Sequence, residues 1–422
     1  MTTTTTTTTH EPDTDVVVIG AGLAGLRCAT GLMDAGLDVV VLEAGDAVGG
    51  RIRTDRVDGH LLDRGFQVLN PSYPRVRADI DVAALGLQPF GRGAGVMRDG
   101  GRSLVADPLR HPGRLADTLR SGFVTPASVI ALARWAAPAL GPVERLVRTD
   151  RAGWHETLDA AGVRGPVREE LFERFLAGVI LEDDGSSASA YVRLLVRSFA
   201  LATPGLPTDG MAALPAQLAD RLGDRVLLDA RALSVRTSGG LAVVHTDAGA
   251  LRARQVVVAV GGQDVAGLVD LPAVATKGLV TWWFSTTERP TGLDMLILDA
   301  RHDSGGLVNT AVVSNAAPSY APAGRHLVQA TAVTSLGVPT DEQVRARLAS
   351  LYATDTSRWD LLARHDVEHS LPVQPAGRAL REPVELDATT VVCGDHRDTE
   401  SIQGALASGA RTAEVVRARL RA

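Results

Sequence analysis

The sequence predicts an α/β protein with two domains, the second of them an α+β domain. Three observations lead to this prediction. An apolar, β-branched run at Val16–Ile19 is followed by a glycine-rich turn, a helical pattern and a second apolar run at Val39–Leu42. Residues 76–209 lose this alternation and hold mainly helical patterns. Strand patterns return within residues 210–262 and again near the C-terminus.

The glycine-rich turn has the spacing Gly20-x-Gly22-x-x-Gly25, which is typical of a Rossmann-like, dinucleotide-binding βαβ unit. Gly20 permits the tight turn, Gly22 lets a pyrophosphate approach the backbone, and Gly25 lets the helix pack closely on the strand. The helix N-terminus offers N–H groups and about half a positive charge to phosphates. Glu43 ends the second strand, where its carboxylate can accept hydrogen bonds from a ribose hydroxyl. The candidate cofactor contacts here are Gly20, Ala21, Gly22, Leu23, Ala24, Gly25, Glu43 and Ala44.

Composition limits the other classes of function. The 422 residues are enough for two domains with substantial cores. A net charge of −6 and the lack of a basic run argue against nucleic acid as a partner. The two cysteines, Cys28 and Cys393, indicate no disulfide framework and are expected to be buried thiols. The ten histidines lack metal-ligand spacing, so we predict no metal site.

Residues 1–14 begin with Met1 and eight threonines and lack the basic and apolar regions of a signal peptide. We therefore expect a disordered tail and a cytoplasmic protein. No apolar run is long enough for a transmembrane helix. The nearest candidate is residues 123–140, which Arg134 and two prolines interrupt. We favour a buried helix of the second domain there, and peripheral contact with a membrane is the alternative.

Gly49-Gly50-Arg51 lies shortly after Glu43. Together with the glycine-rich turn, this motif resembles the second signature of the FAD-dependent amine oxidase, phytoene desaturase and protoporphyrinogen oxidase superfamily. The resemblance implies that Gly50 and Arg51 lie at the cofactor, with Arg51 close to the FAD phosphates. The segment Asp63–Leu69 is similar to a family segment whose backbone runs beside the flavin ring. Its implied cofactor contacts are Gly65, Phe66 and Gln67.

Residues 210–262 resemble the three-stranded meander and return strand of flavoproteins with two dinucleotide-binding folds. The alternating runs are Ala232–Arg236 and Leu241–Thr246, and the return strand is Gln255–Val260. By this resemblance, the backbone of Leu233 contacts the adenine.

The C-terminal strand Thr389–Cys393, Gly394-Asp395 and a helix from Ser401 to about residue 422 resemble the C-terminal FAD signature of the superfamily. Gly394 and Asp395 then bind the ribityl–phosphate region. Ser401 is a good N-cap, so Ile402 and Gln403 present backbone amides to the flavin pyrimidine.

These segments predict a discontinuous FAD-binding domain of residues 15–75, 210–262 and 385–422, and an α+β substrate-binding domain of residues 76–209 and 263–384. The last of these ranges alternates strand-like runs with one helix, Asp341–Tyr352, and suits an antiparallel sheet.

Lys277 is the only lysine among the 43 lysine and arginine residues. Lysine is a compact point charge, whereas arginine is planar and permanently charged, so the exception suggests a chemical reason. Many amine oxidases of the superfamily have a lysine at a similar place, which holds a water against the reactive nitrogen of the flavin. The resemblance implies a catalytic role for Lys277 in reoxidation by dioxygen, and the alternative is a solvated side chain.

The resemblance thus implies an enzyme that transfers a hydride from a substrate C–H bond to non-covalent FAD, during oxidation of a C–N or C–C bond, with reoxidation by dioxygen. The substrate would be a small molecule, either an amine or an apolar polycycle or polyene. A desaturase or protoporphyrinogen oxidase-like enzyme is the first alternative. It is favoured by the helical insertion. It is also favoured because the sequence, with only 4% aromatic residues, does not show the pair of aromatic residues that flanks the flavin in typical monoamine oxidases. A flavoprotein with a redox-neutral or non-catalytic role is the second, and no oligomeric state is predicted.

Overall fold

The computed structural model describes residues 11–107 and 112–421. The chain divides into two compact units. The first comprises Met1–Gly50, Pro215–Val274 and Arg381–Ala422, and the second comprises Arg51–Leu214 and Ala275–Leu380. Residues 51–75, expected in the FAD-binding domain, therefore group with the second unit. Most of the expected tail lies outside the described residues, and Thr14 already belongs to the first strand.

The first unit is built around a seven-stranded sheet with the order β10-β11-β12-β1-β2-β9, in which β18 also pairs with β12. Its strands are β1 (Thr14–Ile19), β2 (Val39–Leu42), β9 (Val226–Leu227), β10 (Ala232–Ser238), β11 (Leu241–Thr246), β12 (Gly249–Val258) and β18 (Thr390–Val392). β12 pairs antiparallel with β11 and parallel with β1 and β18. The predicted return strand, Gln255–Val260, is confirmed up to Val258 as the C-terminal part of β12, a continuous strand whose N-terminal part closes the meander.

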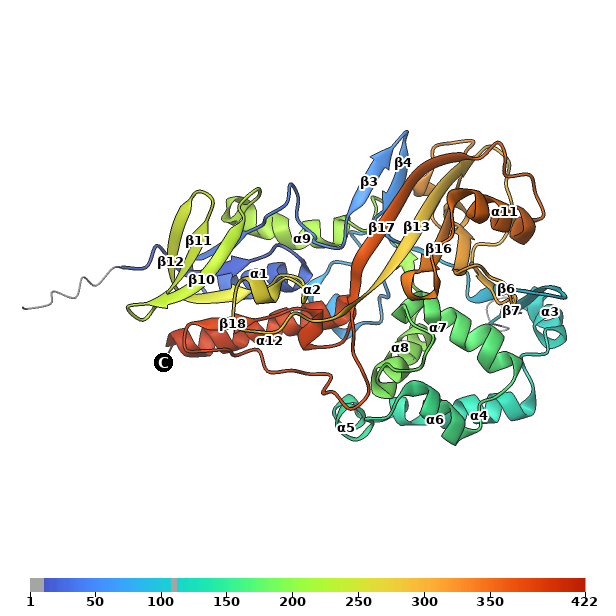
Figure 1. Cartoon of the computed structure of the whole chain (residues 1–422), viewed down its shortest axis with the longest axis horizontal. Coiled ribbons are helices and arrows are strands. Elements are labelled where there is room, and N and C mark those ends of the chain that lie inside the picture. Colours follow the sequence, from blue (N-terminus) through green and yellow to red (C-terminus); the bar gives the residue numbers. More distant parts are fainter. Residues whose placement is uncertain (1–10, 108–111, 422) are drawn as a thin grey trace, which may run out of the picture. The chain divides into compact units, whose positions relative to one another are not determined.

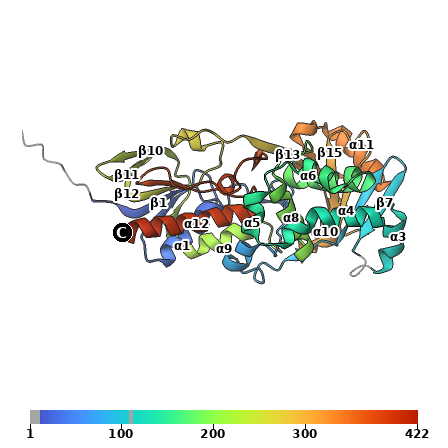
Figure 2. The ribbon, with the colours of Figure 1, turned by 90° about the horizontal axis from the view of Figure 1, so that it is seen from below.

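The helices of the first unit are α1 (Leu23–Asp34), most of α9 (Ala213–Leu222) and α12 (Ile402–Arg421), with single turns η4 (Gly223–Arg225), η5 (Val265–Gly267) and η8 (Asp395–Arg397). Val16, Val17 and Val18 are fully buried, as expected for a parallel strand covered on both faces. Helices α1 and α12 lie side by side (Figures 1 and 2). Both cysteines are free and buried, as predicted.

The second unit contains another seven-stranded sheet, with the order β17-β13-β16-β15-β14-β6-β7. Its strands are β6 (Gly93–Arg98), β7 (Gly101–Ala106), β13 (Thr276–Thr286), β14 (Leu296–Asp299), β15 (Leu307–Val312), β16 (His326–Val333) and β17 (Asp360–Pro372). Two further pairs are β3 (Thr54–Val57) with β4 (His60–Asp63), and β5 (Gln88–Pro89) with β8 (Gly205–Leu206).

This sheet corrects two expectations. It takes β6 and β7 from residues expected to be mainly helical, and β14 pairs with β6 in parallel, so the sheet is not purely antiparallel. The strand β17 was not predicted. It lies at the edge of the sheet, and most of its side chains are charged or only half-buried, so it lacks the apolar pattern that identifies a buried strand.

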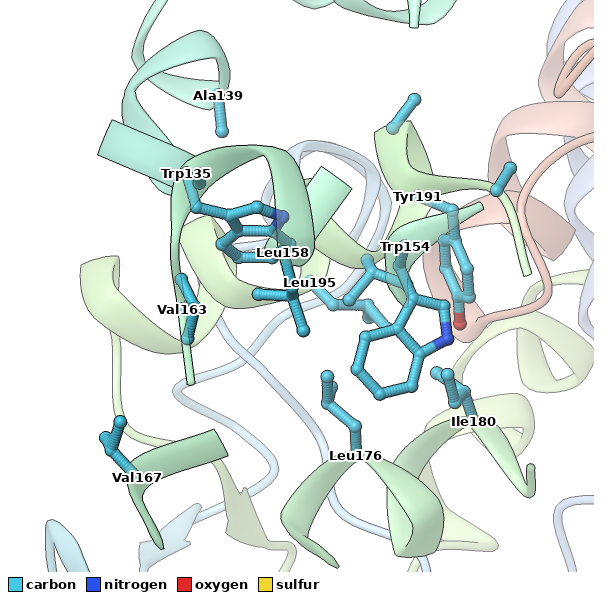
Figure 3. Close-up of a cluster of buried hydrophobic side chains, with 14 of the residues drawn as sticks. Trp135, Ala139, Trp154, Leu158, Val163, Val167, Leu176, Ile180, Tyr191 and Leu195 are labelled. Atoms are coloured by element: carbon cyan, nitrogen blue, oxygen red, sulfur yellow. The ribbon is translucent and has the colours of Figure 1, made fainter. Parts of the chain in front are cut away.

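Helices of the second unit pack around a core that includes Trp135, Trp154, Leu158, Leu176 and Tyr191 (Figure 3). The helices that contribute to this core are α4 (Pro126–Ala136), α5 (Val143–Thr149), α6 (Trp154–Ala161), α7 (Glu173–Ile180) and α8 (Ser189–Leu201). The other helices are α2 (Pro74–Asp79), α3 (Leu115–Arg120), α10 (Val313–Ala316) and α11 (Asp341–Tyr352), and α11 packs in a separate apolar cluster. Shorter turns are η1 (Pro112–Arg114), η2 (Ala137–Leu140), the π-helical η3 (Val167–Phe172), η6 (Pro318–Tyr320) and η7 (Thr334–Leu336).

The helix α4 is less buried than expected. It buries Ala131 and Trp135, whereas Val129 and Ile130 are exposed. The expectation of a buried helix is therefore wrong for its outer side. Within residues 11–107 and 112–421, no helix has the length and apolar character needed to cross a bilayer.

Candidate functional site

The glycine-rich turn of the first unit leaves room for a phosphate group. Gly20 has a φ of +107°, and a Cβ there would lie 2.8 Å from the carbonyl oxygen of Ala259. A Cβ on Gly25 would overlap the carbonyl oxygen of Gly20, so α1 can approach the turn only with glycine there. A Cβ on Gly22 would instead meet nothing within 4 Å. No side chain caps α1 and its first turn contains no acidic residue, so these N–H groups suit an anion.

Glu43 has a structural contact that the sequence analysis missed. Its Oε2 accepts a hydrogen bond from the backbone N–H of Ala21 (2.7 Å), and its Oε1 accepts one from Gly45 (2.9 Å). The carboxylate therefore ties the end of β2 to the glycine-rich turn. Because a carboxylate offers about four acceptor sites, it can still accept a ribose hydroxyl. The predicted contacts Leu23, Ala24 and Ala44 lie directly beside these two elements.

The Gly49-Gly50 pair also lies against this turn. The N–H of Gly49 donates to the carbonyl oxygen of Ala21 (2.8 Å), and a Cβ on Gly50 would lie 3.4 Å from the Cα of Gly22. The structure thus brings these two glycine-containing segments together, about 25 residues apart in sequence.

The predicted C-terminal contacts surround the start of α12. Asp395 is buried, and its carboxylate accepts a hydrogen bond from the N–H of His396 (3.1 Å). Ser401 accepts from the N–H of Gly404 (3.1 Å), so it caps the helix end that Ile402 and Gln403 begin. The N–H of Gly394 donates to the hydroxyl of Ser408 (3.1 Å), which fixes the end of β18 against the helix.

Leu233 occupies an irregular position in β10. The pairing of β10 with β11 shifts register between Ala232 and Ser234, so Leu233 falls at a β-bulge and its side chain is 49% exposed. A bulge takes a residue out of the regular ladder, which leaves its backbone groups available for other contacts.

The residues predicted near the flavin ring belong to the second unit and are held together there. Gln67 donates through Nε2 to the carbonyl oxygens of Arg51 (2.9 Å) and Arg64 (3.0 Å). Arg51 donates to the carbonyl oxygen of Ser370 (2.7 Å). Gly65 has a φ of +81°, and a Cβ there would lie 3.4 Å from Leu279 Cδ1 on β13. Phe66, between Gly65 and Gln67 in the sequence, packs its ring edge-on against Phe90.

Asp63 precedes this segment and is the buried centre of a polar cluster. Its carboxylate accepts hydrogen bonds from the Thr54 hydroxyl (2.6 Å), the Met211 N–H (3.0 Å) and the Tyr320 hydroxyl (2.9 Å). Burial raises the pKa of Asp63 to about 6, against the opposing effect of these hydrogen bonds. The sequence analysis did not identify this cluster, because its members lie far apart along the chain.

Lys277 is not a solvated residue, because its side chain is only 9% exposed. Its Nζ lies 3.3 Å from Glu182 Oε2 and 3.5 Å from the Ser187 hydroxyl. Sequence reasoning missed Glu182, since the run Glu182-Asp183-Asp184 reads as an ordinary solvated loop. Lys277 is two residues from Leu279, whose Cδ1 would lie 3.4 Å from a Cβ on Gly65.

Comparisons with known proteins give a family match over nearly the whole chain. A family model described as flavin containing amine oxidoreductase matches residues 23–417. Putrescine oxidase of Kocuria rosea is 37% identical over 135 residues, which are 31% of this chain and 27% of that protein. Polyamine oxidase 1 of Oryza sativa subsp. japonica is 37% identical over 166 residues, 37% of this chain and 27% of that protein. The chain thus matches about a quarter of the length of these two relatives.

Solved structures resemble the whole chain. Putrescine oxidase bound to putrescine has a TM-score of 0.67 at 20% identity, with 96% of this chain and 99% of that chain covered. A putative protoporphyrinogen oxidase from Exiguobacterium sp. 255-15 has a TM-score of 0.72 at 18% identity, with 97% and 100% covered. At these identities the likeness shows a common fold and no more.

Proposed function

The chain belongs to the flavin-containing amine oxidoreductase family, as its sequence signatures predict, and we propose that it is an FAD-dependent oxidase of the amine oxidase type. The observation that carries this proposal is the buried ion pair of Lys277 with Glu182, on the same strand as Leu279, which lies beside Gly65. When bound, FAD would supply the acceptor for a hydride from a substrate C–H bond, and dioxygen would reoxidise the reduced flavin.

The residues proposed to hold FAD fit the cofactor in each unit. In the first unit, the first turn of α1 faces the phosphates and Glu43 accepts from the ribose. Gly50, Leu233, Gly394, Asp395, Ile402 and Gln403 complete that set. The open space at Gly22 and the uncapped helix end support this assignment. In the second unit, family resemblance supports Arg51 and the backbone of Gly65, Phe66 and Gln67. Lys277 is proposed as the catalytic group, which holds a water for reoxidation.

The test is anaerobic reduction of the purified holoenzyme. We expect a flavin absorption spectrum that bleaches when a primary or secondary amine is added without oxygen and returns when air is admitted. Bleaching only by apolar polyenes or porphyrinogens would favour the desaturase or protoporphyrinogen oxidase-like alternative. A flavin that none of these compounds bleaches would contradict both and favour a non-catalytic role.

Exposed apolar residues favour the second candidate, a desaturase or protoporphyrinogen oxidase-like enzyme. Such an enzyme acts on an apolar substrate, which would reach it from a lipid phase. Val124 just before α4, Val129 and Ile130 on α4, and Leu140 at the end of η2 are exposed apolar residues at the surface of this segment, and the exposed fraction reaches 81% at Leu140. A surface helix normally turns charged side chains to water, yet α4 has Arg134 as its only charge. This surface supports peripheral contact with a membrane as part of the second candidate.

The charges around this surface favour an anionic bilayer over a second copy of the chain. Three arginines, Arg134, Arg145 and Arg148, and one acid, Glu144, are exposed on α4 and α5, so these helices carry an excess of positive charge although the whole chain has a net charge of −6. A symmetric dimer through this surface would bring equivalent arginines together, whereas anionic lipids would neutralise them.

Vesicle flotation tests this contact. We expect binding to phosphatidylcholine vesicles that contain phosphatidylglycerol, weaker binding to pure phosphatidylcholine, and loss of binding in Ile130→Glu and Leu140→Glu. Leu227→Glu is the matched control, because Leu227 is also exposed but lies on β9. Equal flotation of all variants would contradict the contact, and so would a dimer that these substitutions dissociate.

A further inference from the structure

Glu182 is a buried carboxylate on which five donors converge, the most distant being the Ser186 hydroxyl, 3.4 Å from Oε2. Its Oε1 accepts hydrogen bonds from the indole N–H of Trp154 (3.1 Å) and the backbone N–H of Ser187 (2.8 Å). Its Oε2 accepts from the Ser187 hydroxyl (2.7 Å) and from Lys277 Nζ (3.3 Å). The residue is 7% exposed. Oε1 is bound by Trp154 on α6 and Oε2 by Lys277 on β13, so the carboxylate is fixed from two sides.

The backbone around Glu182 is shaped to turn this side chain inward. Leu181 ends α7 with a φ of +57°, a left-handed conformation that costs a leucine energy and needs support from its surroundings. Gly185 has a φ of +75°, and a Cβ there would overlap the ring of His155 on α6. The loop of residues 182–188 therefore packs closely against α6, and a residue larger than glycine does not fit at position 185.

The same loop is fastened at its far end. The N–H of Ala188 donates to the carbonyl oxygen of Gln374 (3.1 Å), and Ser187 forms a bridge with Pro375. The chain just after β17 is thus tied to the residues that bind the carboxylate. β17 in turn pairs with β13, and Lys277 lies opposite Leu371 in that pair. Loop and lysine are consequently held in one framework within the second unit.

We propose that Glu182 is the positioning residue of Lys277. An ammonium on a flexible four-carbon chain has many orientations in water, and burial without a partner is costly. The Glu182 carboxylate offsets part of that cost and holds Nζ at the entry of β13. This inference rests on the proposed function, in which Lys277 acts at the flavin. Glu182 acts only through the lysine.

Reoxidation kinetics test the proposal without a known substrate. The flavin of the holoenzyme is reduced by light in the presence of EDTA without oxygen and then mixed with dissolved oxygen. We expect Glu182→Gln to slow reoxidation about tenfold or more, because a small displacement of a positioned group has effects of this size. Asp183→Asn is the matched control: it removes the neighbouring carboxylate, which is exposed, and should stay within about twofold of the wild-type rate.

A double-mutant cycle separates positioning from an independent effect. If Glu182 acts through Lys277, the double variant Lys277→Met/Glu182→Gln reoxidises no more slowly than Lys277→Met alone. The double variant removes the ammonium and the carboxylate together, so it leaves no buried charge without its partner. Multiplication of the two single effects in the double variant would overturn the proposal.

The single lysine permits a readout that does not depend on activity. Holoenzyme labelled with ¹⁵N-lysine has one side-chain nitrogen to observe. An ammonium held in a buried ion pair exchanges its protons slowly, so we expect one Nζ–H signal in the wild type and in Asp183→Asn, and its loss in Glu182→Gln. Persistence of the signal in Glu182→Gln would overturn the proposal. Loss of the signal together with wild-type reoxidation by Lys277→Met would leave the anchoring intact and remove the proposed role of the lysine.

Discussion

Glu43 illustrates how one carboxylate can serve both the fold and the cofactor. Its two oxygens accept hydrogen bonds from the backbone N–H groups of Ala21 and Gly45, so they shape the glycine-rich turn in the protein without a cofactor. A substitution at Glu43 therefore loosens the turn and, if Glu43 binds the ribose as proposed, also removes a cofactor contact.

We predict that Glu43→Ala weakens FAD binding by about 1–3 kcal/mol, the cost of leaving a ribose hydroxyl without its acceptor. Glu43→Gln should weaken it less, because its amide oxygen can still accept one of the two backbone bonds. The measurement is titration of the apoprotein with FAD, followed by flavin fluorescence. Asp38→Asn is the control, because Asp38 directly precedes β2 whereas Glu43 directly follows it. This variant should bind FAD as the wild type does. Equal affinity of Glu43→Ala and wild type would show that the carboxylate does not support the site.

Lys277 is the second residue whose single substitution is informative. Lys277→Met keeps the length of the side chain and removes its charge, so we expect slower reoxidation of reduced flavin and an unchanged affinity for FAD. Stopped-flow mixing with oxygen measures the first quantity and fluorescence titration the second. A wild-type rate of reoxidation would contradict the assigned role, whereas loss of FAD would indicate a structural role instead.

At the scale of elements, the contact between α1 and α12 sets the relative position of two helix N-termini. Gly409 lies in the second turn of α12, and a Cβ there would overlap the backbone of Ala24 in the first turn of α1. Small residues are thus required where the two helices cross.

We predict that Gly409→Ala forces these helices apart and destabilises the first unit by about 1–3 kcal/mol, as overpacking does elsewhere. Urea unfolding measures the loss, and FAD affinity should fall with it. Gly267→Ala is the control in the same unit, because a Cβ at Gly267 meets nothing within 4 Å. An unchanged midpoint for Gly409→Ala would mean that the crossing has room for a methyl group.

The cluster around Asp63 joins β4, η6 and the start of α9, and it makes stability depend on pH. Because burial raises the pKa of Asp63 from 3.8 to about 6, the folded state holds its proton more tightly than the unfolded state. The contribution is full below pH 4 and is lost as the pH rises through about 6.

Between about pH 5 and pH 7, this group should therefore remove about 1 kcal/mol of stability. Urea unfolding at the two pH values measures the change, and in Asp63→Asn the part due to this group should disappear. An identical pH dependence in wild type and variant would contradict the shifted pKa.

At the scale of the whole molecule, three distant segments of the chain build the first unit and two build the second, each around its own sheet. The first unit thus depends on chain ends that lie more than 330 residues apart. A cofactor that binds the folded segments stabilises all of them together.

We accordingly predict that FAD at about a hundred times its Kd stabilises the protein by about 2.7 kcal/mol relative to the apoprotein. Differential scanning calorimetry of the two forms measures this shift, and Glu43→Ala should show a smaller one at the same FAD concentration. Identical melting curves with and without FAD would contradict cofactor binding to the folded protein.

The α/β class, the βαβ unit, the capped C-terminal helix and the family could all be predicted from the sequence, because each depends on residues close together in the chain. The glycine spacing at Gly20–Gly25 and the N-cap at Ser401 act over a single turn of backbone. The turn and the helix start that they produce depend on neighbouring residues only, so they can be predicted from the sequence.

Only the tertiary structure brought Glu182 to Lys277 and Tyr320 to Asp63, across 95 and 257 residues. It also decided that β6 joins the sheet beside β14, and that α4 turns Val129 and Ile130 to water. These outcomes depend on which distant surfaces exclude water together, and no local pattern encodes that choice. The sequence by itself determined that the chain binds a dinucleotide-type cofactor, and the fold decided which carboxylate holds its only lysine.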